Sequence, residues 1–233
     1  MSDLERERSA HSRVAETYAA YARTGHAERW QGGTAGDRLM AEERDRWLVE
    51  VLLPVADGVI VDVGCGDGNV ARTLERDVHR PAGYLGLDLM LERIAGAREA
   101  TPWARLAVAS AAHLPLADAA ADAMVASTLL SSLPEPWERA AAAAEMARTL
   151  RPGGRAVVYD LRYPNPGNTS VRTVSLSELR RLFPGWRLAG ARTLTVLPPL
   201  ARSSLFGGKR RYAILSRIPM LRSHLGVVLE KPR

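Results

Sequence analysis

The chain has little cysteine and no long hydrophobic run. Its 233 residues include one cysteine, Cys65, and five histidines without metal-ligand spacing. We therefore expect no disulfide, no metal site and a reducing, cytoplasmic compartment. No apolar run approaches the roughly 18 residues of a membrane-spanning helix. The start, residues 1–11, is charged and lacks an apolar stretch behind it, so we also expect neither a secretion signal nor a membrane span.

Lysine is scarce as well, although the formal net charge is +6. Only Lys209 and Lys231 among the 32 basic residues are lysines, and the many arginines and alanines are typical of a GC-rich bacterial genome. The basic residues are scattered and often stand beside acids, as in residues 42–46, which favours solvated helix faces over a specific nucleic-acid surface. One denser cluster, Lys209-Arg210-Arg211, indicates either a charged surface helix or a site for an anionic partner.

Short β-branched runs alternate with helical patterns along the chain. We expect strands at residues 59–63, 84–88, 106–109, 123–127, 156–160, 192–197 and 226–230. We expect helices at residues 37–53, 70–78, 90–100, 137–150, 175–183 and 209–216. This alternation predicts an α/β fold with a doubly wound, mostly parallel sheet and helices on both faces. The length favours one domain over residues 1–233, in which residues 1–53 form an N-terminal helical cap.

A glycine-rich turn, Asp62-Val63-Gly64-Cys65-Gly66-Asp67-Gly68, follows the first predicted strand. Glycines allow the backbone to approach a ligand closely. Their spacing is G-x-G-x-G, and Asn69 stands where a dinucleotide-binding turn has its last glycine, so no pyrophosphate cradle is expected. Asp88 ends the next predicted strand, where a carboxylate can accept hydrogen bonds from both hydroxyls of a ribose. This order favours a ribose-containing ligand over a plain structural turn.

The segment VIVDVGCGDG (residues 59–68), followed by GLDL (residues 86–89), resembles the class I S-adenosylmethionine-dependent methyltransferases. Residues 113–122 and residues 145–154 are similar to two further segments of that family. The resemblance covers residues 59–161 and implies a Rossmann-like, seven-stranded sheet. Residues 54–161 would be its cofactor-binding core, and residues 162–233 would complete the sheet and face the substrate. Segments after the fourth and fifth strands are similar to small stand-alone bacterial methyltransferases.

The resemblance also implies contacts with S-adenosylmethionine, whose product would be S-adenosylhomocysteine. It places the backbone of Gly64, Cys65 and Gly66 under the methionine part of the cofactor. It assigns the ammonium group to Asp62 and the ribose hydroxyls to Asp88. The remaining assignments are Leu89 on the adenine, Ser110 and Ala111 at the adenine edge, and the carbonyl of Ser127 at the ammonium. Ser110 departs from the aspartate that is frequent in the family, so its contact with the adenine amino group should be weaker.

Residues for the methyl acceptor are expected at the strand ends and in the cap. Asp160 is a candidate general base or amine ligand, and Arg162 a candidate ligand for a carboxylate or phosphate. A structural ion pair between them is an equally good interpretation. Tyr18 is a candidate cover for the methyl group, although it shares a helix face with Tyr21 and both could be core residues.

We predict methyl transfer to N, O or C of a small molecule, in bacterial natural-product or glycan tailoring. The partner would be that acceptor, with no specific nucleic acid, and the oligomeric state, monomer or homodimer, stays open. Two alternatives remain: an RNA or protein methyltransferase, and a regulatory or assembly protein that binds S-adenosylmethionine without catalysis.

Overall fold

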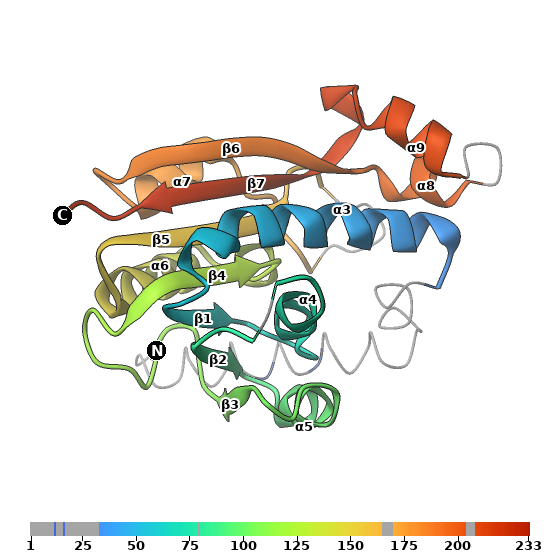
Figure 1. The fold of residues 1–233 in the computed structure, drawn as a ribbon. Helices are drawn as coiled ribbons and strands as arrows, with labels where there is room; N and C mark the ends of the chain where they lie inside the picture. Colours follow the sequence, from blue (N-terminus) through green and yellow to red (C-terminus); the bar gives the residue numbers. More distant parts are fainter. Residues whose placement is uncertain (1–11, 13–15, 17–32, 79, 165–169, 204–207) are drawn as a thin grey trace. The chain divides into compact units, whose positions relative to one another are not determined.

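The structure is a computed structural model that describes residues 12, 16, 33–78, 80–164, 170–203 and 208–233 (Figure 1). The chain divides into two compact units. The smaller unit combines residues 1–43 with 195–222, and the larger one combines residues 44–194 with 223–233. The boundaries after residues 53 and 161 that the sequence suggested remain predictions.

Seven strands form one sheet, in the order β3-β2-β1-β4-β5-β7-β6. They are β1 (Val59–Val63), β2 (Gly83–Asp88), β3 (Arg105–Val108), β4 (Ala121–Ser127), β5 (Leu150–Leu161), β6 (Arg187–Val196) and β7 (Arg222–Glu230). The first five pair in parallel, and β7 runs antiparallel to β5. This confirms the predicted doubly wound, mostly parallel sheet. The strand order reverses between β1 and β4, and ligands of such sheets bind beyond the carboxyl ends of the strands there.

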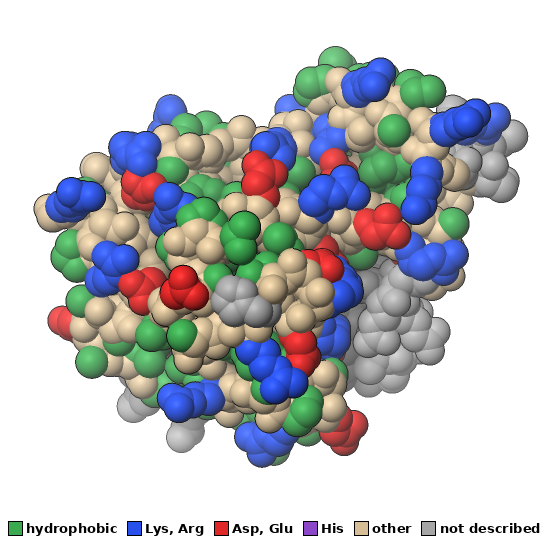
Figure 2. Space-filling view, viewed as in Figure 1, with side chains coloured by type: hydrophobic (Ala, Val, Ile, Leu, Met, Phe, Trp, Pro, Cys, Tyr) green, Lys and Arg blue, Asp and Glu red, His purple; other side chains and the backbone are tan. Residues whose placement is uncertain are grey.

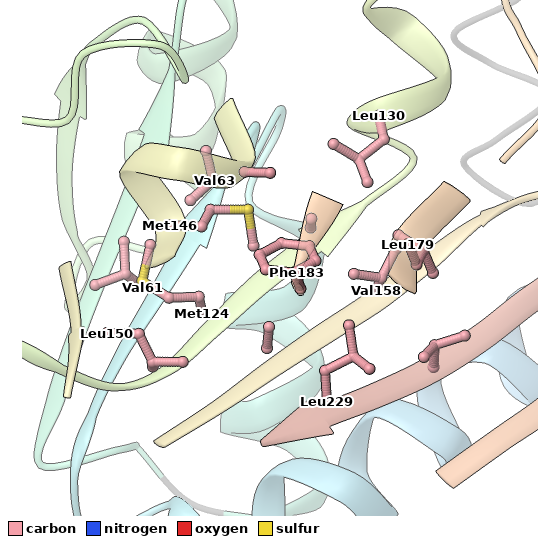
Figure 3. Packing of buried hydrophobic residues seen from close by; sticks show 14 of the residues in the cluster. Val61, Val63, Met124, Leu130, Met146, Leu150, Val158, Leu179, Phe183 and Leu229 are labelled. Atoms are coloured by element: carbon pink, nitrogen blue, oxygen red, sulfur yellow. The ribbon is translucent and has the colours of Figure 1, made fainter. Parts of the chain in front are cut away.

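Helices cover both faces of the sheet, because the buried strands carry apolar side chains on each side. On one face, α6 (Pro136–Thr149) and α7 (Leu176–Leu182) contribute Met146 and Leu179 to a core that also contains Val61 and Met124 (Figure 3). On the other face pack α4 (Asn69–Asp77) and residues 44–52 of α3 (Ala35–Leu52). Next to β2 and β3 lies α5 (Leu91–Ala100).

Helix and strand ends follow local sequence signals in most places. The Ser175 side chain caps α7 by accepting a hydrogen bond from the backbone N–H of Glu178. Three strands begin well before their predicted starts. β6 begins at Arg187 instead of residue 192, and β7 at Arg222 instead of residue 226. β5 begins at Leu150 instead of residue 156, and runs through Pro152 and Gly153. The cause in β5 is an irregular register, in which Leu150 pairs with Ala121 while Arg155 pairs with Ala123.

The smaller unit contains the first part of α3, α8 (Pro198–Arg202), α9 (Lys209–Leu215) and the 3-10 turn η3 (Pro219–Leu221). Its buried apolar side chains are Met40, Val196, Ala201 and Tyr212. Two acids of α3 bond within the unit: Asp37 accepts from Arg202 Nε at 2.7 Å, and Glu43 Oε2 accepts from Tyr212 Oη at 2.7 Å. Glu43 also forms an ion pair with Arg222. None of the described helices combines the length and apolar character needed to cross a membrane.

Candidate cofactor and acceptor site

The glycine turn after β1 has a backbone that only glycine adopts readily. Gly64, Gly66 and Gly68 have φ angles of +72°, +55° and +76°, in the left-handed region. The N–H groups of Gly64 and Cys65 both donate to the carbonyl of Leu87, at 2.7 and 2.9 Å. The turn is therefore fixed to the carboxyl end of β2, and Gly68 opens α4.

Asp88 joins the turn to β2 through its side chain. Its Oδ2 accepts from the Gly66 N–H at 2.8 Å, and its Oδ1 accepts from the Met90 N–H at 2.9 Å. The Arg93 guanidinium approaches the same carboxylate, with Nη1 at 4.0 Å from Oδ2. Each carboxylate oxygen can accept a further hydrogen bond. Asp88 therefore has the capacity to bind two ribose hydroxyls while it holds the turn.

Asp62, one residue before the end of β1, is a fully buried carboxylate. Its Oδ2 accepts from Tyr84 Oη at 2.8 Å, whereas its Oδ1 has no hydrogen-bond partner among the described residues. Burial, and secondarily the charge of Asp88, raises the pKa of Asp62 to about 7; the hydrogen bond from Tyr84 opposes this rise. A buried carboxylate oxygen without a donor is costly. An ammonium group would satisfy it, so the residues fit the aminoacyl part of S-adenosylmethionine.

The remaining predicted cofactor residues lie at neighbouring strand ends. Leu89 and Met90 follow β2 and are partly exposed. The hydroxyl of Ser110 already accepts from the N–H of Ala112 at 3.2 Å, and Ala111 is partly buried beside it. The thiol of Cys65 is buried, and this burial raises its pKa well above the usual range. Cys65 is therefore a poor nucleophile, which agrees with a packing role in the turn.

The turn after β4 contains a strained residue, Thr128, for which the sequence predicted no role. Thr128 has φ +57°, which is rare for a β-branched side chain. Its Oγ1 donates to the carbonyl of Ser127 at 2.7 Å, and its N–H donates to the carbonyl of Tyr159 at 2.7 Å. These bonds fix the direction of the Ser127 carbonyl, which keeps a second lone pair for a ligand.

Asp160, near the end of β5, is 1% exposed. Its Oδ2 accepts from the Ser131 N–H at 3.1 Å and its Oδ1 from the Leu161 N–H at 2.8 Å. Burial raises the pKa of Asp160 to about 6, against the effect of these hydrogen bonds. The carboxylate thus ties β5 to η2 (Leu130–Ser132), a positioning function that the sequence did not predict.

Of the other two acceptor candidates, the structure describes Arg162 but not Tyr18. Arg162 is partly exposed, and its guanidinium lies 4.8 Å from the centre of the Tyr163 ring. Its N–H donates to the carbonyl of Ser223 at 2.9 Å. Tyr18 lies outside the described residues, so its role stays a prediction. Within the described ranges, no group of three His, Cys, Asp or Glu side chains could hold a metal ion.

Two further residues shape the site, Tyr84 and Arg93. Tyr84 on β2 pairs with Ile60 on β1, and Ile60 precedes Asp62 by two residues. The side chains of Tyr84 and Asp62 therefore lie on the same face of the sheet. The pairing of these two strands could therefore have predicted the hydrogen bond from Tyr84 to Asp62. A Cβ on Gly66 would lie 2.1 Å from Arg93 Nη2. The sequence carried no comparable signal that this arginine, on α5, covers the glycine turn.

Comparison with known proteins agrees with this geometry. Residues 61–158 match the family model described as a methyltransferase domain. A protein of Mycobacterium ulcerans, described as an uncharacterized methyltransferase, is 33% identical over 132 residues, which cover 56% of this chain and 49% of that protein. The chain thus spans half or less of the length of the curated relatives it matches.

Solved structures share the fold at low sequence identity. The N-methyltransferase NodS from Bradyrhizobium japonicum superposes with a TM-score of 0.63 at 16% identity, covering 84% of this chain and 99% of that chain. The [4+2]-cyclase SpnF superposes with a TM-score of 0.59 at 20% identity, covering 81% of this chain and 80% of that chain. Residues 61–158 thus match a methyltransferase domain, and the sheet order and the glycine turn agree with that match.

Proposed function

We propose that the protein is an enzyme that transfers a methyl group from S-adenosylmethionine to N, O or C of a small molecule. The observation that carries this proposal is the buried carboxylate of Asp62, whose Oδ1 lacks a donor among the described residues, beside the Asp88-anchored glycine turn. A carboxylate in this position favours a ligand with a cationic group and a ribose. NADH has a ribose but no ammonium, so it should not bind measurably.

Several residues would hold the cofactor. Asp62 Oδ1 would accept from its ammonium, with the carbonyl of Ser127 as a second acceptor. Asp88 would bind the ribose hydroxyls, with Leu89, Ser110 and Ala111 around the adenine. The bound cofactor supplies an electrophilic methyl group on a sulfonium. The chain must then orient a nucleophile and, where needed, remove its proton.

The acceptor would lie at the carboxyl ends of β4 and β5. The pKa of Asp160, about 6, suits a general base near neutral pH, although both its oxygens already accept backbone hydrogen bonds. Arg162 would bind an anionic group of the substrate, and Tyr18 would cover the methyl group. Between Leu161 and Val174 the sequence contains only two basic residues, Arg162 and Arg172. Binding of RNA usually depends on more phosphate contacts, which supports a small acceptor.

The test is turnover with S-adenosylmethionine labelled in its methyl group. The protein is incubated with a bacterial metabolite extract, with total RNA, or with a protein lysate, and the labelled fraction is identified. We expect label in a low-mass compound, and less of it with the control variant Asp62→Asn, which should bind the cofactor more weakly. Label in RNA or protein would contradict the choice of a small acceptor. Tight cofactor binding without labelling of any fraction would support a non-catalytic binding protein.

The place of this chemistry in bacterial natural-product or glycan tailoring is part of the same proposal. The composition of the chain, with its many arginines and alanines, supports this part of the proposal. The identity of the labelled product tests it. A labelled polyketide-like, peptide or sugar compound would agree with it, whereas a labelled primary metabolite would not.

A further inference from the structure

Residues 208–221, which contain α9 and η3, carry an unusual density of exposed apolar and basic side chains; we refer to them as the basic–apolar segment. Its exposed apolar residues are Ile214, Ile218 and Met220, with 60%, 43% and 76% of their surface accessible. Its exposed basic residues are Lys209, Arg210, Arg211 and Arg217. Large exposed apolar side chains gathered in one short segment mark an interaction surface more often than isolated ones do.

The exposure of these side chains follows from how α9 packs. Tyr212 is buried and Leu215 partly buried, in contact with the apolar cluster of the smaller unit. Arg210 and Ile214 are four residues apart and thus share the opposite helix face. In Figure 2, hydrophobic and basic side chains stand next to each other over the region where Figure 1 shows α9. The segment therefore presents a mixed face to its surroundings.

Along the sequence, the nearest charged residues on both sides of the segment are basic. The sequence contains no Asp or Glu between Glu178 and Glu230, but ten Lys and Arg residues. In the smaller unit, Asp37 and Glu43 form ion pairs with Arg202 and Arg222. These two acids thus pair with arginines outside the exposed set, and α9 itself carries Lys209, Arg210 and Arg211 but no acid.

We propose that the basic–apolar segment docks on an anionic lipid surface. Basic side chains on such a face are attracted to anionic headgroups, while apolar side chains beside them enter the interface between headgroups and acyl chains. The three exposed apolar residues favour lipid over nucleic acid, because phosphate contacts need charge alone and base stacking needs aromatic or guanidinium planes. Docking of this kind is peripheral and does not depend on methyl transfer.

Co-sedimentation of the full chain with vesicles tests this proposal. We expect binding to phosphatidylcholine vesicles that contain about one third phosphatidylglycerol, and at least about tenfold weaker binding to pure phosphatidylcholine. The double variant Arg210→Ala, Arg211→Ala should bind the anionic vesicles about twentyfold more weakly. Met220→Ser should weaken binding about fivefold, because an apolar side chain is lost from the interface.

Matched controls are available on the larger unit. Arg180 and Arg181 on α7 are also adjacent and exposed, and Leu91 is an apolar residue with 66% exposure. Replacing Arg180 and Arg181 by alanine, or Leu91 by serine, should change vesicle binding by less than about twofold. Circular dichroism and the cofactor affinity of each variant establish that it is folded.

Three results would overturn the proposal. The first is equal loss of vesicle binding in the Arg210, Arg211 variant and in the Arg180, Arg181 control, which would indicate a general charge effect. The second is tighter binding of RNA than of anionic vesicles, with RNA displacing the protein from them. The third is a dimer in light scattering that Met220→Ser dissociates, which would assign the apolar face to a second copy of the chain.

Discussion

Asp62→Asn should make the ligand-free protein more stable, although it removes a residue of the proposed cofactor site. Burial raises the pKa of Asp62 from 3.8 to about 7, so the folded chain binds this proton more tightly than the unfolded chain. The resulting penalty is absent below pH 3.8, grows as the pH rises, and is complete above about pH 7. The gap between the two pKa values corresponds to about 4 kcal/mol, at about 1.4 kcal/mol for each pH unit.

The asparagine removes the buried charge, but it still leaves a buried polar group without a hydrogen-bond partner among the described residues. Its oxygen can still accept from Tyr84, whereas its amide N–H groups take the place of Oδ1, which has no partner among the described residues. An unsatisfied buried amide costs about 1–2 kcal/mol. The net gain at pH 8 should therefore be about 2–3 kcal/mol, or about 5–10 °C in Tm for a chain of this size. At pH 5 most of the penalty is already relieved, and the variant and the wild type should be nearly equal.

Thermal and urea unfolding of the ligand-free proteins at pH 5 and pH 8 measures this effect. Asp122→Asn is the matched control, because the Val59 N–H and Arg151 lower the pKa of Asp122. That variant should be destabilised at pH 8, with the opposite sign. An Asp62→Asn protein that is folded but less stable than the wild type at pH 8 would refute the reasoning. At pH 8 its affinity for S-adenosylmethionine should fall at least about tenfold.

Further predictions concern the acceptor side, the core and the turn. Asp160→Asn and Arg162→Ala should keep cofactor affinity within a few-fold and lose at least about 100-fold in methyl transfer; activity that follows only the folded fraction would make both residues structural. His224 is buried and stacked on Tyr159 at 4.6 Å, and burial, with the charge of Arg44, lowers its pKa to about 3. The neutral imidazole contributes its full stability above pH 6.5, and this contribution is lost as the pH falls towards 3. The free energy of unfolding of His224→Phe, measured in urea, should therefore rise relative to the wild type by about 3 kcal/mol between pH 7 and pH 4.5. A difference that does not change with pH would contradict this. Gly66→Ala should lower the free energy of unfolding by about 1–2 kcal/mol because of its left-handed backbone, and an unchanged value would show that the turn relaxes without cost.

Much of the sheet was predictable because its strands contain short apolar runs, some of which are followed by glycine or end in an acid, as β1 and β2 do. β1 has the predicted bounds, and Asp88 ends β2 as expected. The start of β5 was not predictable, since Pro152 and Gly153 normally signal a turn and only the partner β4 accommodates their irregular register. The short α8 was missed for a similar reason, because Pro198 and Pro199 suggest a loop although they also suit a first helical turn.

Only those parts of the candidate site that lie in sequence motifs were predictable. The glycine turn and its two acids could be found from spacing. The orphaned oxygen of Asp62, the strain at Thr128 and the position of Arg93 over the turn depend on contacts between distant segments. Local propensity carries no information on such contacts. For the same reason the sequence did not predict that Asp160 holds η2.

Calorimetric titration of S-adenosylmethionine into the wild type and into Asp88→Asn tests the central claim most directly. We predict one binding site in the wild type, at least about tenfold weaker binding in the variant, and no measurable binding of NADH to either. The variant keeps one oxygen to hold the Gly66 N–H and loses a charged acceptor for ribose. Unchanged affinity in a folded Asp88→Asn protein, or a wild type that binds NADH and not S-adenosylmethionine, would contradict the account.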